Sequence, residues 1–266
     1  MNRKIKRALI SVSDKSKLFK ILPILKKFKI EILSSGGTYK YIKKSGFGCI
    51  EISDFTGFQE ILDGRVKTLH PKIHSGILYN RDDKRHIDQI KSHNFKNIDL
   101  VIVNFYPFEK TVLKTKNENT IIENIDIGGP SLVRSAAKNF KNVAVITSNY
   151  QLDNLISEMS INKGSTSLKF RKELSQEAFN ETAYYDTNIS KYFNKIARIK
   201  YPKKITFNGL LVNRLRYGEN PHQTGALYSK DHFDELEKLN GKELSYNNYN
   251  DIYFGLDIIN SLPKGI

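Results

Sequence analysis

The fold of this chain is constrained most by two unbroken apolar runs, Leu-Val-Ile-Val-Asn at 100–104 and Val-Ala-Val-Ile-Thr at 143–147. Runs of this kind are typical of strands buried on both faces, as in parallel sheets that are covered by helices. Further strands are predicted at 7–12, 30–33 and 48–52, and amphipathic helices at 15–28, with a kink at Pro23, and at 38–44. The sequence therefore predicts an α/β fold with three layers (α/β/α) and a mostly parallel sheet.

The sequence pattern changes after about residue 150. A long amphipathic helix is predicted over 169–199, with an inward stripe of five aromatic and apolar residues: Phe170, Leu174, Phe179, Tyr184 and Tyr185. Tyr201-Pro202 interrupts this pattern, and a strand is predicted at 205–211. We therefore predict one domain at 1–200 and an incomplete second domain at 201–266, a segment too short to form an ordinary domain alone.

The composition argues against several classes of protein. The net charge is +15, but the lysines and arginines are dispersed, which favours small anionic ligands over nucleic acid. The single cysteine, Cys49, cannot form an internal disulfide. No run of the sequence approaches the roughly 20 apolar residues that a membrane-spanning helix needs. We therefore expect a soluble, cytoplasmic protein that binds neither nucleic acid nor membranes.

Two polar loops follow the first two predicted strands and suggest a phosphate site. In Ser11-Val12-Ser13-Asp14-Lys15-Ser16, Ser13 or Asp14 can cap the next helix, with Lys15 beside the positive helix end. In Ser34-Ser35-Gly36-Gly37-Thr38, the two glycines allow consecutive N–H groups to converge on an anion, although such a pair also suits a plain tight turn. Neither loop is a Walker loop or a dinucleotide fingerprint. Their shared position at one sheet edge favours a ribose monophosphate.

Three further segments concentrate chemically useful side chains. Gly64–Pro71 brings Arg65, Lys67, Thr68 and His70 into one irregular loop, and Tyr106 follows the apolar strand at 100–104. In the segment at 125–139, Asp126 precedes a helix that is predicted to begin at Pro130 and to leave the N–H groups of Gly129 and Ser131 free, with Arg134 and Lys138 on one face. Taken singly, each lysine is more often a solvated surface charge, and Tyr106 a core aromatic residue.

The histidine pair in this region also has a plain structural interpretation. His70 and His74 have a spacing that suits a metal, but Pro71 stands between them and no third ligand is evident. Packing or substrate positioning is the preferred interpretation, and no metal site is predicted.

In this order and spacing, the segments at 65–71, 104–108 and 126–139 resemble the cyclohydrolase half of the bifunctional purine biosynthesis protein family, which joins IMP cyclohydrolase to AICAR transformylase. The resemblance covers nearly the whole chain and implies a methylglyoxal-synthase-like fold for the first domain. It implies catalytic roles for four residues: Lys67, Tyr106, Asp126 and Lys138. It also implies substrate contacts for ten others: Ser13, Lys15, Ser34, Gly36, Gly37, Thr38, Arg65, Thr68, Gly128 and Gly129.

The segments at 216–223 and 239–247 resemble the start of the transformylase half. By this resemblance, Arg216, Tyr217 and Asn247 are remnants of that domain's substrate site. The family's transformylase uses 10-formyltetrahydrofolate as co-substrate, and we expect no such activity from these 266 residues alone. The resemblance allows a homodimer.

The implied activity is closure of the purine ring of formyl-AICAR, a purine ribonucleotide precursor, to IMP with loss of water and without a cofactor. Two alternatives stay open. A methylglyoxal synthase or a phosphate-sensing domain would share the Ser-Gly-Gly-Thr loop but has no need of the segments around Lys67 and Asp126. A non-catalytic phosphate-ligand-binding module, or an inactive remnant of the bifunctional enzyme, would keep the pocket without the reaction.

Overall fold

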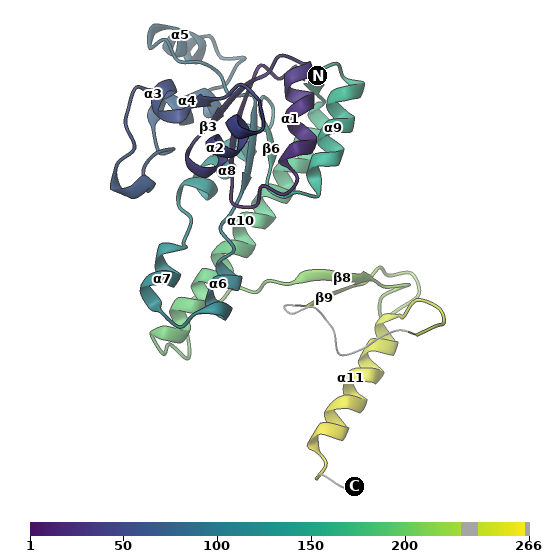
Figure 1. Cartoon of the computed structure of the whole chain (residues 1–266). Helices are drawn as coiled ribbons and strands as arrows, with labels where there is room; N and C mark the ends of the chain where they lie inside the picture. The colour runs from purple at the N-terminus through teal and green to yellow at the C-terminus, as the bar shows by residue number, and fades with distance from the viewer. Residues whose placement is uncertain (230–238, 264–266) are drawn as a thin grey trace. The chain divides into compact units, whose positions relative to one another are not determined.

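The computed structural model describes residues 1–229 and 239–263 of the chain (Figure 1). The chain divides into two compact units, Met1–Ala197 and Arg198–Ile266, which we call unit 1 and unit 2. Within the described residues, no helix is both long and apolar enough to cross a membrane.

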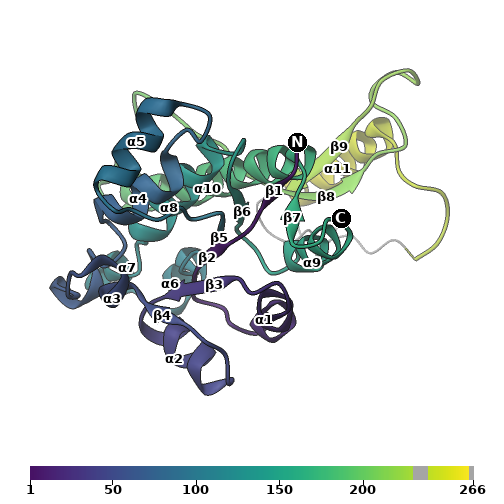
Figure 2. The same cartoon turned by 90° about the horizontal axis from the view of Figure 1, so that it is seen from above.

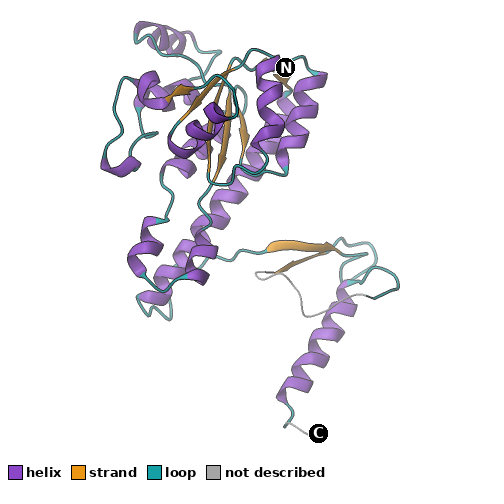
Figure 3. Ribbon diagram, in the orientation of Figure 1, coloured by secondary structure: helices purple, strands orange, loops and turns teal. Residues whose placement is uncertain are grey.

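Unit 1 is built on a five-stranded sheet in which every neighbouring pair of strands is parallel (Figure 3). The order across the sheet is β4-β3-β2-β5-β6. These strands are β2 (Arg7–Val12), β3 (Glu31–Ser34), β4 (Ile50–Glu51), β5 (Leu100–Asn104) and β6 (Ala144–Ile146). A separate antiparallel pair joins β1 (Arg3–Lys4) to β7 (Ser165–Thr166).

Helices cover both faces of the sheet, so that unit 1 has three layers (Figure 2). Helices α1 and α9 pack against each other on one face. On the other face, α8 packs against β5 and β6 and contacts both α4 and α10, and α10 also contacts β6. The helices are α1 (Leu18–Lys27), α2 (Gly36–Lys44), α3 (Ile52–Thr56), the 3-10 helix η1 (Leu62–Gly64), α4 (Pro71–Leu78), α5 (Lys84–Ser92), α6 (Phe108–Lys114), α7 (Glu118–Glu123), α8 (Gly128–Lys138), α9 (Gln151–Ile161) and α10 (Leu168–Ile196).

The strand order reverses direction between β2 and β5. From β2 the chain continues outward to β3 and β4, whereas β5 and β6 extend the sheet on the other side. Val12, the last residue of β2, is paired with Asn104, the last residue of β5. In open α/β sheets ligands bind outside the carboxyl ends of the strands at such a reversal, because the flanking loops diverge there. The topology alone therefore marks this edge as a binding site.

The strands predicted at 7–12 and 100–104 are confirmed, and 143–147 forms β6 in a slightly shorter span. The helix predicted at 15–28 begins only at Leu18 and runs through Pro23 to Lys27, so the first loop is longer than expected. The strand predicted at 48–52 is largely wrong, since only Ile50 and Glu51 pair with β3. Helix α3 follows at once and is closed by Gly57, whose φ of 75° is left-handed.

Helix α10 confirms the helix predicted at 169–199 to within a few residues, but its inward stripe differs from the prediction. Phe179 is 39% exposed, whereas Leu174 and Tyr185 are buried as expected. The inward face also carries Arg171, which is 1% exposed and donates hydrogen bonds to four backbone carbonyls, among them that of Phe140. Hydrogen-bonding capacity, as well as hydrophobicity, therefore decides which side of α10 faces inward.

Unit 2 comprises an antiparallel pair, β8 (Leu210–Arg214) and β9 (Ala226–Ser229), followed by helix α11 (Tyr246–Ser261). The strand predicted at 205–211 is wrong for most of its length, because only its last two residues belong to β8. Helix α11 begins with a capping box, in which Ser245 and Asn248 bond each other's backbone N–H groups.

Candidate functional site

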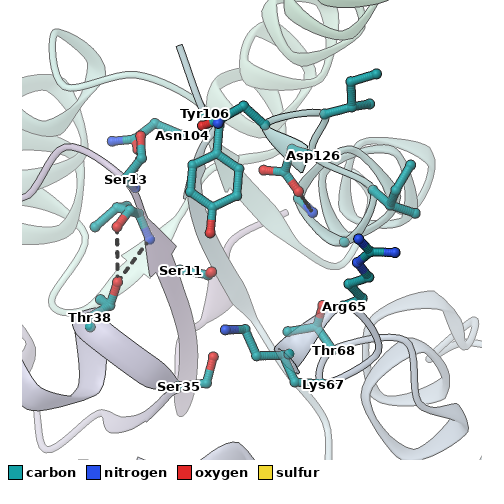
Figure 4. Close-up of a pocket in the computed structure, with 18 of the residues that line it drawn as sticks. Ser11, Ser13, Ser35, Thr38, Arg65, Lys67, Thr68, Asn104, Tyr106 and Asp126 are labelled. Atoms are coloured by element: carbon teal, nitrogen blue, oxygen red, sulfur yellow. Dashed lines mark hydrogen bonds between the residues drawn. The ribbon is translucent and has the colours of Figure 1, made fainter. Parts of the chain in front are cut away.

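A pocket of about 810 Å³ lies at the carboxyl edge of the sheet, where the strand order reverses (Figure 4). Its lining comes from five places in the chain: the end of β2, the start of α2, the loop before α4, the end of β5, and the segment from the end of α7 to the start of α8. The lining residues are Ser11, Val12, Ser13, Lys15, Ser35, Gly37, Thr38, Gly64, Arg65, Lys67, Thr68, Asn104, Tyr106, Ile122, Glu123, Asn124, Ile125, Asp126, Ile127, Gly128 and Gly129.

The loop after β2 is fixed to the end of β5 by one side chain. The Asn104 side-chain oxygen accepts the N–H groups of Ser13 at 2.6 Å and Asp14 at 3.1 Å, and its amide nitrogen donates to the Asp14 carbonyl at 3.0 Å. The Asp14 carboxylate accepts the Ser16 N–H at 2.9 Å, in a turn that precedes α1, while Lys17 is the helix cap residue. The prediction that Ser13 or Asp14 caps this helix is therefore wrong.

The start of α2 offers the groups that an anion requires. Ser35 precedes the helix and is 7% exposed, and its hydroxyl has no hydrogen-bond partner within the described part of the chain. The next three N–H groups belong to the first turn, which a helix leaves without internal partners. Two ammonium groups flank this turn, because a Cβ placed on Gly37 would lie 3.8 Å from Lys15 Nζ and one on Gly36 3.3 Å from Lys67 Nζ. We call this arrangement the anion cradle.

Three of the predicted hydroxyl ligands are already engaged in structural hydrogen bonds. Ser34 is fully buried and donates to the Ile10 carbonyl at 2.7 Å, so its hydroxyl points into the sheet and Ser35 takes its predicted place in the pocket. Thr38 donates to the Val12 carbonyl at 3.0 Å, as the dashed lines in Figure 4 indicate. Ser13 donates toward the Phe105 carbonyl at 2.8 Å. Thr38 and Ser13 line the pocket, but their hydroxyls hold the loops in place.

Lys67 extends from the loop before α4 into the pocket. Its ammonium lies 3.7 Å from the Glu60 carboxylate, and its side chain is 28% exposed. Figure 4 shows Lys67 and Tyr106 pointing toward one another from opposite sides of the pocket. Lys67 is therefore the ammonium group of the anion cradle that also faces the strand end carrying Tyr106.

Asp126 lies across the pocket, just before α8. Its carboxylate accepts the N–H of Gly129, in the first turn of that helix, at 2.8 Å. Burial raises the pKa of Asp126 above its ordinary value, although hydrogen bonds from the N–H groups of Gly129 and Tyr106 and the charge of Lys67 oppose the shift. A partly buried carboxylate with these neighbours is suited to accepting a proton.

The same contact corrects a prediction about the helix start. Helix α8 begins at Gly128, before Pro130. The Gly129 N–H is bonded to Asp126, and the Ser131 N–H donates to the Ile127 carbonyl at 3.3 Å. These two groups are therefore not free to bind a ligand oxygen.

The Tyr106 side chain is 47% exposed and lines the pocket above Ser11 and Lys67 (Figure 4). Partial burial raises the pKa of its phenol, and the nearby carboxylates of Asp126 and Glu60 add to this shift. The phenol therefore keeps its proton at neutral pH and can donate a hydrogen bond to a ligand.

The remaining predicted residues near Asp126 occupy the pocket rim. Arg65 lines the pocket and pairs with Glu123 of α7. Thr68 is buried beside the start of α8, since a Cβ on Gly128 would lie 2.6 Å from its hydroxyl oxygen. Both glycines at this helix start, Gly128 and Gly129, line the pocket as predicted.

Lys138 is the one predicted catalytic residue that the structure does not bring into the pocket. It is exposed and is the last residue of α8, whereas the pocket lies at the first residue of this helix. The helix has 11 residues, so its two ends are about 15 Å apart. The length of α8 therefore separates Lys138 from Asp126, which lies just before the start of this helix.

The two histidines have structural partners in unit 1. His70 accepts the Lys72 N–H at 3.1 Å and caps α4, while His74 Nδ1 lies 3.0 Å from the Ser135 hydroxyl. Burial lowers the pKa of His74, which favours the neutral ring. In residues 1–229 and 239–263, no group of His, Cys, Asp and Glu side chains is arranged to hold a metal ion.

In unit 2, the predicted transformylase remnants lie close to one another. The Arg216 guanidinium lies 4.9 Å from the ring centre of Tyr217, and the Asn247 amide donates to the Glu219 carbonyl at 3.4 Å. The two segments that marked these residues, 216–223 and 239–247, thus meet at the hydrogen bond between Asn247 and Glu219.

Sequence reasoning missed several pocket residues. Ser11, Ser35 and Asn104 line the pocket without having been assigned as ligands. All three could have been found from their position at or just beyond a strand's carboxyl end, which is where the topology places a ligand. Glu123, which lines the pocket, and Glu60, which pairs with the pocket residue Lys67, were also not predicted, because each is recognisable only through the cation that it pairs with.

Comparison with protein families gives two matches that together cover most of the chain. The MGS-like domain matches residues 17–131, and the AICARFT/IMPCHase bienzyme matches residues 136–265. The first match, with the five-stranded parallel sheet, confirms the fold predicted from the sequence.

Individual relatives extend over nearly all of this chain. It is 47% identical over 253 residues to the bifunctional purine biosynthesis protein PurH of Bradyrhizobium diazoefficiens, an alignment that covers 94% of this chain and 48% of that protein. It is 49% identical over 262 residues to PurH of Leptospira biflexa, covering 98% of this chain and 51% of that protein. The chain thus spans about half the length of the curated relatives it matches. A crystal structure of ForH superposes with a TM-score of 0.64 at 26% identity, covering 71% of this chain and 99% of that one.

Proposed function

Because this chain belongs to the family of the bifunctional purine biosynthesis protein PurH, of which it spans about half, we propose that unit 1 is an IMP cyclohydrolase. Its substrate would be formyl-AICAR, and its products IMP and water. The observation that carries this proposal is a single pocket with an anion cradle on one side and a lysine, a tyrosine and a partly buried aspartate around the remaining space.

The pocket has the size and charge that a ribose monophosphate requires. Its volume of about 810 Å³ is in the usual range for small-molecule sites. The 5′-phosphate would bind at the anion cradle, where the Ser35 hydroxyl, the first N–H groups of α2 and the ammonium of Lys15 converge. The base portion would then extend toward Tyr106 and Asp126.

Ring closure is an intramolecular reaction, so binding the substrate in a reactive conformation removes much of the barrier. The carboxamide nitrogen attacks the formyl carbon and forms the new N–C bond. The nitrogen gives up one proton, and the formyl oxygen becomes a hydroxyl group. This hydroxyl then leaves as water, together with the proton of the formamido nitrogen that carries the former formyl carbon. Loss of water forms the C=N bond between that nitrogen and that carbon. The atoms balance without an oxidant, a reductant or a cofactor.

The pocket side chains can act on each of these steps. Negative charge develops on the formyl oxygen during the attack, and the ammonium of Lys67 and the phenol of Tyr106 are positioned to stabilise it. Asp126 would accept the proton that leaves the nitrogen, since its raised pKa makes it a better base than an exposed carboxylate. Lys138 has no role in this scheme, because it lies at the far end of α8.

Unit 2 matches part of the bienzyme model, and we propose that it corresponds to the start of the transformylase portion. The co-substrate of a complete transformylase would be 10-formyltetrahydrofolate. No step of the ring closure proposed for unit 1 uses that co-substrate.

The proposal is tested by measuring IMP formation from formyl-AICAR with the 266-residue chain and with a Lys67→Met variant. Loss of the ammonium should lower kcat by about 10²–10³-fold, the usual effect of removing one charge-stabilising donor. Lys72→Met is the matched control, because Lys72 lies over the Phe55 ring and does not line the pocket. Equal rates for both variants would refute the role of Lys67, and a pocket that binds the nucleotide without turnover would favour the binding-module alternative.

A further inference from the structure

Helix α10 places a buried hydroxyl directly behind Asp126. Tyr185 is 6% exposed and does not line the pocket. Its hydroxyl oxygen accepts the backbone N–H of Asp126 at 2.8 Å and lies 3.4 Å from the Asn124 carbonyl, to which it donates. A single phenol thus binds two backbone groups of the segment between α7 and α8.

The ring of Tyr185 contacts the strand end that carries Tyr106. Its centre lies 5.0 Å from that of Phe105 and 6.3 Å from that of Phe108. Phe105 is buried and directly precedes Tyr106 in the chain. Tyr185 therefore bonds the backbone of one proposed catalytic residue, Asp126, and packs against the residue that precedes the other, Tyr106.

Two independent contacts fix Asp126 between them. Tyr185 holds its backbone N–H, and the Gly129 N–H holds its carboxylate at 2.8 Å. Without the hydrogen bond from the Asp126 N–H to Tyr185, the segment between α7 and α8 could shift. The hydrogen bond to Gly129 alone would then not fix the position of the Asp126 carboxylate. The position of the carboxylate relative to Lys67 and Tyr106 therefore depends on the phenol of α10.

We propose that Tyr185 is a positioning residue for ring closure, which acts by holding the backbone of Asp126 so that its carboxylate meets the reacting nitrogen. This inference rests on the proposed cyclohydrolase function. Burial raises the pKa of Tyr185 to about 12, so the phenol keeps the proton that it donates to Asn124 while it accepts from Asp126. A geometric shift of about 1 Å at a catalytic group can lower a rate by as much as 10²-fold.

The test is the Tyr185→Phe variant, which removes only the hydroxyl and keeps the ring packing. We expect kcat for formyl-AICAR to fall about tenfold, equivalent to about 1.4 kcal/mol, while KM changes by less than about twofold. Tyr184→Phe is the matched control, because the neighbouring Tyr184 hydroxyl lies 3.3 Å from Glu109, which does not line the pocket. Both variants should unfold cooperatively, which shows that each retains a folded state.

A second variant separates positioning from general stability. Asp126→Glu already displaces the carboxylate, so adding Tyr185→Phe to it should cost less in kcat than the same change costs in the wild-type chain. The inference would be overturned if Tyr185→Phe lowered kcat by the same factor in the Asp126→Glu variant as in the wild-type chain. It would also be overturned if the kcat of Tyr185→Phe equalled the wild-type value. Hydrogen exchange at the Asp126 amide of the wild-type protein gives a readout that needs no variant. Slow exchange is expected, and exchange as fast as in an exposed loop would contradict the hydrogen bond.

The activity of the wild-type chain distinguishes failure of the proposed function from failure of the role of Tyr185. If the wild-type chain forms no IMP, the proposed function is wrong and this inference falls with it. If the wild-type chain is active and Tyr185→Phe matches it, only the role of Tyr185 is refuted.

Discussion

The Asn104 side-chain oxygen accepts the Ser13 N–H at 2.6 Å and so joins the carboxyl ends of β5 and β2. These strands flank the reversal in strand order, where two loops would otherwise diverge. The link fixes the loop that carries Lys15, one of the two ammonium groups at the anion cradle. Asn104, through its hydrogen bonds to the loop after β2, thereby fixes the shape of the end of the pocket where we propose that the phosphate binds.

Substituting Asn104 with alanine should weaken substrate binding. The change leaves the N–H groups of Ser13 and Asp14 without their acceptor, so the free energy of unfolding should fall by about 1–3 kcal/mol. KM for formyl-AICAR should rise about tenfold as the loop loses its fixed position, measured from initial rates of IMP formation. The control is Asn180→Ala on the exposed side of α10. A KM equal to that of the control would show that the loop keeps its shape without Asn104.

Gly129→Ala should lower kcat by displacing Asp126. An added Cβ would lie 2.4 Å from one carboxylate oxygen of Asp126 and 2.9 Å from its Cγ, so the side chain must move. We expect at least a tenfold loss of kcat with little loss of stability, because alanine is favoured over glycine in a helix by about 1 kcal/mol. At Gly48 a Cβ meets nothing within 4 Å, which makes Gly48→Ala the matched control. Wild-type kcat in Gly129→Ala would mean that the carboxylate position is not critical.

Asp126→Asn should separate stability from activity. Because burial raises the folded-state pKa of Asp126 above 3.8, the folded protein retains a proton that the unfolded chain has already released. The free energy of unfolding therefore falls as the pH rises through this window, and the buried charge lowers stability at neutral pH. Asparagine removes the charge and still accepts the Gly129 N–H.

The variant should accordingly have a higher Tm than the wild type at neutral pH and a kcat lower by about 10²-fold or more. The difference in Tm should shrink as the pH is lowered through the raised pKa of Asp126, because the wild-type carboxyl then becomes neutral in the folded protein. Thermal unfolding followed by circular dichroism across this pH range measures both trends. A variant that is less stable at neutral pH would show that Asp126 gains more from its charged contacts than it loses by burial.

Much of the fold could be predicted because the central strands are continuous apolar runs in the sequence. Residues 100–104 form an apolar run whose first four members are all buried, and a strand that is buried on both faces has few alternatives. Residues 52–56 were harder to interpret. Ile52 and Phe55 are buried three residues apart, a spacing that suits one helical turn, but a segment of five residues is too short to show a periodicity. The left-handed Gly57 was the only local signal of a helix end.

The site could be predicted at the level of segments but less well at the level of atoms. Ser34 and Ser35 are adjacent and chemically identical, and only the strand register decides that Ser34 bonds β2 while Ser35 faces the pocket. Lys138 lies within a dozen residues of Asp126 in sequence, yet it is at the opposite end of α8 from the pocket. Tyr185 lies 59 residues from Asp126, and the hydrogen bond between them becomes visible only when α10 is packed.

Residues 1–197 should retain ring closure without unit 2. Every residue that lines the pocket belongs to unit 1, and so do all members of the hydrophobic core cluster. The isolated fragment should therefore fold cooperatively and have kcat and KM within about twofold of the whole chain, because it contains the residues of the pocket lining and of this core cluster. A fragment that folds but forms no IMP would show that unit 2 contributes to the reaction.

The central claim, that unit 1 closes the purine ring, is tested most directly by incubating the purified chain with formyl-AICAR alone and following the absorbance of IMP. We predict saturable IMP formation well above the uncatalysed rate, with no metal, folate or other cofactor added. A rate that does not exceed the uncatalysed reaction, in a sample shown to be folded, would contradict it.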